Sequence, residues 1–356
     1  MSQNNFDSIQ EVQAKQSAPK PKPKRKRGLH WYTKILIAVD LCACACFFTV
    51  YGPVPQFKNW YVTTALTTAT HQYLAYVFYS EDKVKEIADA NTMESINEDS
   101  DDSAIQFVEY DDTGTYASVY EEQILKKKNP DDRYKIVEIE EDDYHGYIAV
   151  LYDPKGLSLA ISKYSNGELV SDFAERTKAL VATNAGPFRR DANNNTYPYN
   201  VVISKGEVYS TYTKKKTVIG MNADGILMLK SFSTAKQAVK AGYVWGVQFG
   251  PNLVVNGKKS SFKGNGGYGI QPRTAIGQRK DGIVLLVVIE GRGASGSSGI
   301  SMPDLAELFV RYGCYNAANL DGGGSSVMVV KNKLMNNPAG WGYSGERYLY
   351  NALIYK

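Results

Sequence analysis

The chain has 356 residues, of which 43% are hydrophobic and 12% aromatic, so it can form a sizeable core in one or two domains. Its net charge of +4 conceals separate basic and acidic segments, and it contains only three histidines, none of them after His145. A Ser-His-Asp triad, a Cys-His pair or a histidine-ligated zinc site would therefore depend on His145, which by default is a surface residue.

The N-terminal segment predicts a membrane anchor. Residues 1–30 are polar and basic, and residues 31–52 form an apolar run, interrupted mainly by Asp40, of about the length that a bilayer requires. Basic residues before the run predict a cytoplasmic N-terminus and an extracellular remainder in a single-pass cell-membrane protein. The alternatives are a signal peptide cleaved near residues 43–45 and a basic tail that binds nucleic acid. The apolar run directly behind the tail favours the uncleaved anchor and no nucleic-acid partner.

Two accessory segments are expected next. Residues 53–92 carry apolar residues at helical spacing, and Ser80 can cap a second helix, so they predict a helical stalk. Residues 93–132 are acidic and poor in apolar side chains, which is typical of a loosely ordered linker. The acidic stretch "NEDSDD" (97–102) lacks the ligand spacing of a calcium-binding EF-hand loop.

Residues 133–356 predict an α+β domain. Short β-prone runs alternate with glycine turns, which is the signature of antiparallel hairpins. Helices are expected at 167–180 and after Ser301, where Pro303 and Asp304 suit a first turn and Gly313 ends the pattern. Cys314 is the one cysteine after the apolar run, so an internal disulfide is excluded and the domain must be held by its core. The fold class is thus a hairpin-rich α+β domain with a few helices, preceded by one N-terminal transmembrane helix.

Without histidine, catalysis must rest on carboxylates and arginines. Glu290 follows the seven-residue apolar strand at 283–289, and Asp321 opens a triple glycine in "NLDGGGSSVMVV" (319–330). A carboxylate at the rim of a core can be aimed and its pKa tuned, while adjacent glycines leave backbone amides free to donate. Arg273 precedes a strand and Arg292 lies two residues after Glu290; guanidinium pairs suit phosphate oxygens, although Arg292 could equally be a structural partner of Glu290.

The triple-glycine turn is neither a phosphate loop nor a linker. No lysine follows the glycines at the spacing of a Walker loop, and residues 327–330 are β-prone. "GRGASG" (291–296) also fits no dinucleotide-binding fingerprint. A tight catalytic turn is the favoured interpretation. Asp191 and Glu346 are weaker candidates, for which loop salt bridges are the alternative.

Six segments together resemble, in order, the motifs of the phosphodiester glycosidase family, and the resemblance covers residues 133–356. They are "NAGPF" (184–188), "FGPNLVVNGK" (249–258), "RTAIGQRKDG" (273–282), "VVIEGR" (287–292), "NLDGGGSSVMVV" (319–330) and "ERYLYNALI" (346–354). Two departures stand out. The family usually has Asp where this chain has Glu290, and it commonly has a second glycine and paired aromatics where this chain has Ala185 and Pro187.

The resemblance implies hydrolysis of the bond between a sugar C1 and a phosphodiester oxygen, with an N-acetylglucosamine-1-phosphodiester-like substrate or a phosphate-linked cell-wall or exopolysaccharide polymer. It implies catalytic roles for Glu290, Asp321 and Arg292. The residues expected to bind substrate are Arg273, Asn184, Gly186, Phe188, Asp191, Gly322, Gly323, Gly324, Ser325, Ser326 and Arg347. No cofactor or metal ligand is expected, and a calcium or magnesium ion has no diagnostic spacing to support it. A non-catalytic binding module and a glycopolymer transferase remain alternatives.

Overall fold

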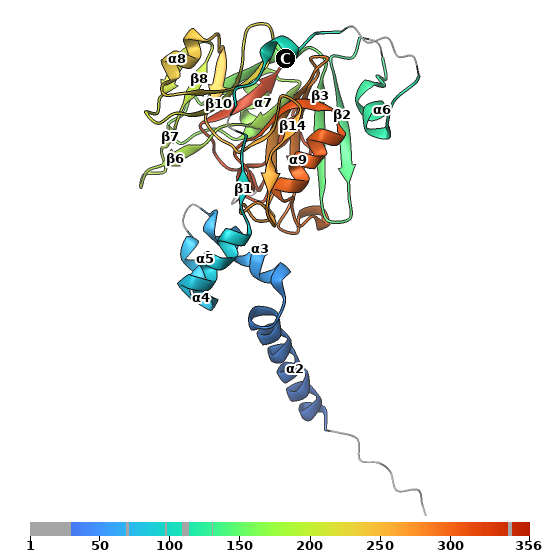
Figure 1. Ribbon diagram of the computed structural model, residues 1–356, viewed down its shortest axis with the longest axis vertical. Helices are drawn as coiled ribbons and strands as arrows, with labels where there is room; N and C mark the ends of the chain where they lie inside the picture. The colour runs from blue at the N-terminus through green and yellow to red at the C-terminus, as the bar shows by residue number, and fades with distance from the viewer. Residues whose placement is uncertain (1–29, 69–70, 97, 109–113, 130, 341–343) are drawn as a thin grey trace, which may run out of the picture. The chain divides into compact units, whose positions relative to one another are not determined.

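The computed structural model describes residues 30–356 except 69–70, 97, 109–113, 130 and 341–343 (Figure 1). The chain divides into two compact units, Met1–Val54 and Pro55–Lys356.

The described part of the first unit is helix α2 (Trp31–Tyr51), which begins after His30. It is 21 residues long with a mean hydropathy of 1.9, and none of its side chains is buried. By length and composition α2 could cross a membrane, although a signal sequence has the same properties.

The second unit begins with a small group of helices. They are α3 (Pro55–Leu66), η1 (Gln72–Leu74), α4 (Ala75–Phe78) and α5 (Glu81–Ala90). Ser80 caps α5 as predicted, since its side chain accepts a hydrogen bond from the Lys83 amide at 3.3 Å. The group touches the loop before Arg273: the side-chain amide of Gln271 donates to Thr67 at 2.8 Å. The segment expected to be a stalk therefore supports a loop of the β domain.

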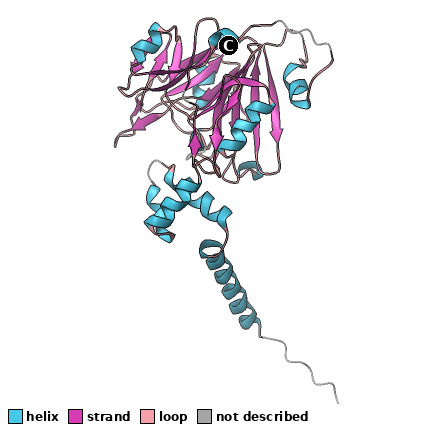
Figure 2. Cartoon of the chain, viewed as in Figure 1, coloured by secondary structure: helices cyan, strands magenta, loops and turns pink. Residues whose placement is uncertain are grey.

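Three larger antiparallel sheets build the rest of the unit (Figure 2). The seven-stranded sheet contains, in spatial order, β14 (Lys258–Lys259), β13 (Asn252–Val255), β18 (Cys314–Asn319), β16 (Arg273–Arg279), β17 (Val284–Ile289), β3 (His145–Leu151) and β2 (Tyr134–Glu140). A five-stranded sheet contains β20 (Lys333–Leu334), β19 (Met328–Val330), β5 (Val181–Asn184), β21 (Asn351–Tyr355) and β4 (Leu157–Ile161). Another five-stranded sheet contains β11 (Leu227–Phe232), β10 (Lys216–Met221), β12 (Trp245–Val247), β8 (Val202–Ser204) and β9 (Glu207–Ser210).

Two short ribbons and several helices complete the described fold. The ribbons are β1 (Met93–Glu94) with β15 (Ser261–Phe262) and β6 (Phe188–Arg190) with β7 (Thr196–Pro198). The longer helices are α6 (Val119–Leu125), α7 (Val170–Thr177), α8 (Ala235–Lys240) and α9 (Met302–Arg311), and the 3₁₀ turns are η2 (Asp102–Ala104), η3 (Pro154–Gly156), η4 (Ala294–Gly296) and η5 (Gly323–Ser325). This mixture of helices and antiparallel strands confirms the predicted α+β class.

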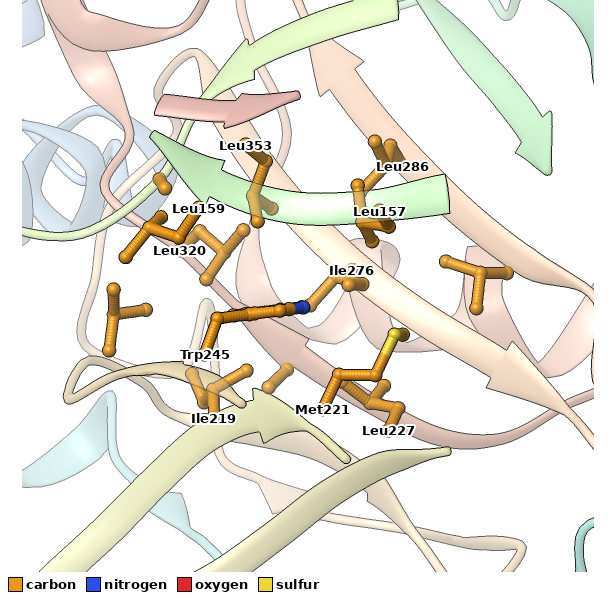
Figure 3. Packing of buried hydrophobic residues seen from close by; sticks show 14 of the residues in the cluster. Leu157, Leu159, Ile219, Met221, Leu227, Trp245, Ile276, Leu286, Leu320 and Leu353 are labelled. Carbon is orange, nitrogen blue, oxygen red and sulfur yellow. The ribbon is translucent and has the colours of Figure 1, made fainter. Parts of the chain in front are cut away.

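The three larger sheets share one hydrophobic core. Figure 3 shows Trp245 of β12 among Ile276 of β16, Leu353 of β21 and Leu320, which follows β18. Trp245 is about 1% exposed, and burial of a side chain this large contributes roughly 2–3 kcal/mol. The shared core keeps the loops at the sheet ends in fixed relative positions, which a precise active site requires.

Helix α9 covers the outer face of the seven-stranded sheet. Its stripe of Leu305, Leu308 and Phe309 is buried against β13 and β18. Ser301 caps the helix, accepting from the Asp304 amide at 3.3 Å, as the sequence predicts. Helix α7 is shorter than the expected 167–180, because Lys178 adopts a left-handed conformation (φ 55°) that ends it.

The acidic segment differs from the expected loose linker. Strand β1 pairs with β15, and the Ser100 side chain accepts a hydrogen bond from the Leu229 amide at 2.9 Å. The Asp99 carboxylate accepts from the Ser231 amide at 2.8 Å. Leu229 and Ser231 belong to β11, an edge strand of its sheet, whose open amides need partners. The segment also buries Ile105, Ile124 and Leu125, but these few apolar residues are scattered through an acidic sequence, which is why its composition did not indicate an ordered structure.

Candidate active site

The candidate site lies at one end of four inner strands of the seven-stranded sheet, where neighbouring antiparallel strands begin and end. Asp321 follows the end of β18, Arg273 begins β16, Glu290 follows the end of β17, and His145 begins β3. The register places Arg273 opposite Ile289 and Ala275 opposite Asn319. Because strands are about 4.8 Å apart, the four residues form a row in the order Asp321, Arg273, Glu290, His145. The fold therefore brings together residues up to 176 positions apart, as the numbers of His145 and Asp321 show.

Glu290 is buried and held by three contacts. Its side chain is about 1% exposed, and one oxygen lies 3.0 Å from Nδ1 of His145. The other oxygen accepts a hydrogen bond from the Asn337 amide at 2.5 Å. Ser297 donates to the Glu290 carbonyl at 2.8 Å, which fixes the backbone as well. The carboxylate is thus oriented rigidly, as a catalytic group must be.

His145 bridges two carboxylates. Its Nε2 lies 2.9 Å from Glu138, on the side opposite to Glu290. Burial works to lower the pKa of His145, but the hydrogen bonds to Glu138 and Glu290 outweigh it and the pKa is raised. His145 was expected to be an ordinary surface histidine; the structure instead places it against the candidate catalytic carboxylate.

Asp321 is partly buried in the triple-glycine turn. Burial raises its pKa from 3.8 to about 6, although hydrogen bonds from Ser325 and the Gly322 amide and the charge of Arg347 oppose the rise. A carboxyl group with a pKa near neutrality can gain or lose a proton at physiological pH, which suits acid-base chemistry. Gly323 has φ 60°, a conformation that favours glycine. The amides of Gly323, Ser325 and Ser326 donate to the carbonyls of Pro272, Gly322 and Gly323, so the expectation that the turn amides are free to donate is wrong for these three.

Arginine side chains surround this turn. Arg273 is about 6% exposed and donates to the carbonyls of Tyr268 (2.7 Å) and Gly269 (2.9 Å). Burial lowers the pKa of Arg273 to about 10, opposed by Tyr268 and reinforced by the positive charge of Arg292. Partial burial and then the charge of Arg347 lower the pKa of Arg292. Within the described parts of the chain, no carboxylate lies at salt-bridge distance from Arg273, Arg292 or Arg347.

The structure separates Arg292 from Glu290. Its guanidinium donates instead to the Ala339 carbonyl at 3.3 Å, so the alternative of a structural ion pair with Glu290 is wrong. Its backbone is left-handed (φ 59°), a conformation that costs about 1 kcal/mol or more for a residue other than glycine. Such strain is typical of positions where function requires a particular orientation.

The five-stranded sheet that contains β5 also contributes residues next to the triple-glycine turn. Asn184, at the end of β5, donates to the Asp321 carbonyl and accepts from Thr274 at 2.7 Å. The Gly186 amide donates to Asn351 at 2.7 Å, and a Cβ on Gly186 would lie 2.7 Å from Val247, so only glycine fits there. Asn184 therefore joins the "NAGPF" loop to the triple-glycine turn, while Gly186 holds that loop against β21 and β12.

The remaining expected residues fall into two groups. Ser325 accepts from Arg347 at 3.3 Å, and the Arg347 guanidinium lies 5.2 Å from the Phe188 ring, so these three border the turn with Gly322 and Gly324. Ser326 is buried beside them. Asp191 differs: it accepts hydrogen bonds from Asn193, Asn195 and Tyr197 within its own β6–β7 hairpin, which lower its pKa. It stabilises that turn, and no contact ties it to Asp321 or Glu290 in the described residues.

A metal site has little support. Glu138, Glu140 and His145 offer ligand atoms within 4.8 Å of one another, but both glutamates are exposed and both ring nitrogens of His145 lie at hydrogen-bond distance from carboxylates. Glu346, also considered from the sequence, accepts from the Ser171 amide at 3.1 Å and hydroxyl at 2.8 Å, which secures the start of α7.

Sequence reasoning missed His145 and Asn337 as partners of Glu290. The only local signal for His145 was its position before the β-prone run at 146–151. Pairing of β3 with β17, which puts Gly146 opposite Ile289, could not be read from that run. Asn337 contributes a backbone amide, which no residue type reveals.

Comparison with known proteins finds a matching family model and related sequences. The family model for phosphodiester glycosidase matches residues 177–356. The chain is 32% identical over 183 residues to the SPbeta prophage-derived uncharacterized protein YomE of Bacillus subtilis (strain 168), covering 49% of this chain and 28% of that protein. It is 28% identical over 187 residues to human N-acetylglucosamine-1-phosphodiester alpha-N-acetylglucosaminidase, covering 48% of this chain and 35% of that protein. The chain thus spans about a third of the length of these relatives.

A solved structure has a related fold. The catalytic domain of zebrafish N-acetylglucosamine-1-phosphodiester alpha-N-acetylglucosaminidase, auto-inhibited by its pro-peptide, superimposes with a TM-score of 0.51. The match covers 62% of this chain and 81% of that chain at 22% identity, which establishes similarity of fold.

Proposed function

Because the chain belongs to the phosphodiester glycosidase family, we propose that it hydrolyses the C1–O bond of a sugar-1-phosphodiester. Substrates would be N-acetylglucosamine-1-phosphodiester-like groups, including those of phosphate-linked cell-wall or exopolysaccharide polymers. The observation that carries the proposal is the convergence of Arg273, Arg292 and Arg347 on the turn of Asp321 with no carboxylate at salt-bridge distance in the described residues. Unneutralised guanidinium groups around a carboxyl group fit an anionic, phosphate-bearing ligand.

In the proposed reaction a water molecule supplies the oxygen that bonds to C1. The C1–O bond breaks, its electron pair leaves with the phosphate monoester, and the water proton passes to a carboxylate. Glu290 and Asp321 stand on either side of Arg273 in the row along the sheet edge, so one serves as nucleophile or base and the other as acid or electrostatic partner. The arginines stabilise charge that develops on the phosphate.

We also propose that α2 anchors the chain in the cell membrane with residues 1–30 in the cytoplasm and the active site outside. The length and hydropathy of α2 and the basic residues before it support this arrangement. A tethered hydrolase would act on polymers close to the cell surface.

The test uses the full chain in detergent micelles with the methyl phosphodiester of N-acetylglucosamine-1-phosphate, analysed by mass spectrometry. Hydrolysis gives the free sugar and methyl phosphate. Glu290→Gln should lower kcat by at least about 100-fold, as loss of a catalytic acid or base does. Glu207→Gln, which changes an exposed residue at the start of β9, is the matched control.

The alternatives give different products. A transferase would form a new glycosyl linkage to an added acceptor, and a binding module would leave the substrate intact. Full activity of Glu290→Gln would refute the proposed role of that residue. A parallel reaction with a chelator tests whether a divalent cation takes part.

A further inference from the structure

The helices that follow α2 expose a group of aromatic and apolar side chains, which form the aromatic surface of the second unit. Its members are Trp60 of α3 (41% exposed), Tyr73 of η1 (62%), and Tyr76 (49%), Val77 (55%) and Phe78 (40%) of α4. In the rest of the described second unit, exposed large apolar residues occur singly or in adjacent pairs. A concentration of this kind on a folded unit indicates an interaction surface.

Ring contacts join the two helices that carry the aromatic surface. The Trp60 ring lies 5.8 Å from the Phe57 ring, Phe57 stacks on Tyr61 at 5.9 Å, and the Tyr61 ring lies 5.5 Å from the Phe78 ring. The Tyr61 hydroxyl donates to the Leu74 carbonyl at 2.7 Å, which fixes η1 to α3 as well. Trp60 and Phe78 therefore belong to one packed cluster, and their exposed sides form one continuous surface.

The chain places this surface close to the end of α2. Only residues 52–54 separate α2 from α3. Four residues of extended chain span at most about 14 Å, and Trp60 lies about 8 Å further along α3. With α2 across the membrane, as proposed above, Trp60 can therefore reach the layer between lipid headgroups and acyl chains. Tryptophan and tyrosine, which combine an apolar ring with a polar group, are the residues enriched in that layer.

Electrostatic attraction does not account for the surface. Helix α5 packs against α3 and carries four acidic and two basic side chains, so the helix group has no excess of positive charge there to draw it to anionic lipids. Burial of apolar side chains is the remaining source of attraction. Unlike a contact between exposed charges, it is not screened by salt.

The helix group is also fixed to the loop before Arg273. The side-chain amide of Asn265 donates to the Thr63 hydroxyl at 2.9 Å, and that of Gln271 donates to Thr67 at 2.8 Å. Thr63 lies in α3 and Thr67 directly follows it. A contact of α3 with lipid would therefore hold the β domain and its active-site loop in one orientation to the membrane.

We propose that the aromatic surface inserts into the lipid headgroup layer of the membrane that α2 spans and so holds the β domain against the bilayer. This inference rests on the proposed membrane anchor and goes beyond it. An anchor alone leaves the domain free to rotate on residues 52–54, whereas a second lipid contact fixes the direction that the active site faces.

The experiment places the full chain in phosphatidylcholine nanodiscs, with bromine atoms on the upper part of the acyl chains, where they quench tryptophan on contact. The chain has four tryptophans, so the difference in emission between the unaltered chain and Trp60→Phe isolates the signal of Trp60. We expect brominated lipid to lower this signal at least about 2-fold relative to ordinary lipid, equally at low and high salt.

Tyr76→Ser with Val77→Ser removes two exposed apolar side chains of the surface. We expect this double variant to lose most of the Trp60 quenching. Its kcat/KM for the soluble methyl phosphodiester should stay unchanged, because a small substrate reaches the site by diffusion whatever the orientation of the domain. Val208→Ser with Tyr209→Ser is the matched control: it changes the same two residue types in an exposed adjacent pair on β9, and quenching should not change.

Equal Trp60 emission in brominated and ordinary lipid would overturn the proposal, whether the surface then faces water or a second copy of the chain. An equal loss of quenching in both double variants would also overturn it. Washing membranes with alkaline carbonate tests the anchor separately: release of the chain refutes α2 as an anchor, and quenching of Trp60 by brominated vesicles added to the chain then decides the surface. If no substrate is cleaved, the proposed hydrolysis fails, and the quenching results still decide the lipid contact.

Discussion

Replacing Asp321 with Asn should stabilise the protein while abolishing hydrolysis. Burial raises the pKa of this carboxyl group from 3.8 to about 6, so the folded state holds the proton more tightly than the unfolded state does. The stability that the protonated group provides is therefore complete below about pH 4 and is lost as the pH rises through about 6. At neutral pH the folded protein carries an ionised group in an unfavourable position, and the amide of Asn removes that cost.

The difference between the folded and unfolded pKa values of Asp321 sets the size of the stabilisation expected for Asp321→Asn. A difference of about two pKa units, at about 1.36 kcal/mol each, gives about 3 kcal/mol at pH 7.5 as an upper figure, because the carboxyl group retains some contact with solvent. At pH 4 the difference should fall below about 1 kcal/mol. For a folded unit of this size, about 2 °C in unfolding midpoint accompanies each kcal/mol, so Asp321→Asn should raise the midpoint by up to about 6 °C at pH 7.5.

The assay is thermal unfolding of the full chain in detergent micelles at pH 4 and pH 7.5. Asp191→Asn provides a control of opposite sign, because hydrogen bonding to Asn195 lowers the pKa of Asp191. That carboxylate contributes stability above its unfolded pKa, which is lost as the pH falls through its lowered folded value, so its replacement should destabilise the protein at pH 7.5. A midpoint for Asp321→Asn that is unchanged or lower at pH 7.5, with the same difference at pH 4, would contradict the reasoning.

Three further predictions concern the neighbouring groups. Phosphate at about 100 times its dissociation constant should stabilise the folded chain by about 2.7 kcal/mol, and Arg273→Met should remove most of this effect in a thermal-shift titration; an unaltered shift would exclude Arg273 from anion binding. Glu290→Gln should lower the pKa of His145, measured from its imidazole proton signals by nuclear magnetic resonance, because one of the two carboxylates that raise it is neutralised; an unchanged titration would show that the two side chains do not interact in solution. A chain of residues 133–356 should unfold at lower temperature than one of residues 55–356, because it lacks the pairing of β1 with β15 and the contacts of Ser100 and Thr67; equal midpoints would show that residues 55–132 add no stability.

Local chemistry explains which parts of the fold could be predicted. Ser301 and the apolar spacing of Leu305, Leu308 and Phe309 define α9 within a short window, and the helix is found at Met302–Arg311. Hairpin turns are equally local, since glycines at positive φ encode them directly. The α+β class followed from these signals.

Long-range pairing could not be predicted in the same way. The sequence marked Glu290 and Asp321 as rim carboxylates, but their order along the sheet edge depends on which strands pair, and β16 runs between their strands. The contact of His145 with Glu290 depends on that pairing too. Thr67 and Ser100 stabilise the domain through single hydrogen bonds, which leave no periodic pattern in the sequence.

Several features of the candidate site lower the stability of the folded protein, and a bound anionic ligand would offset them. Arg273 is buried without a carboxylate at salt-bridge distance in the described chain, burial raises the pKa of Asp321, and Arg292 has a left-handed backbone. Natural proteins retain such costs where function requires them. A bound phosphodiester would neutralise the arginines beside Asp321. The same charges that lower the stability of the free protein would therefore provide its affinity for an anionic substrate, and this is why Asp321→Asn is expected to gain stability as it loses activity.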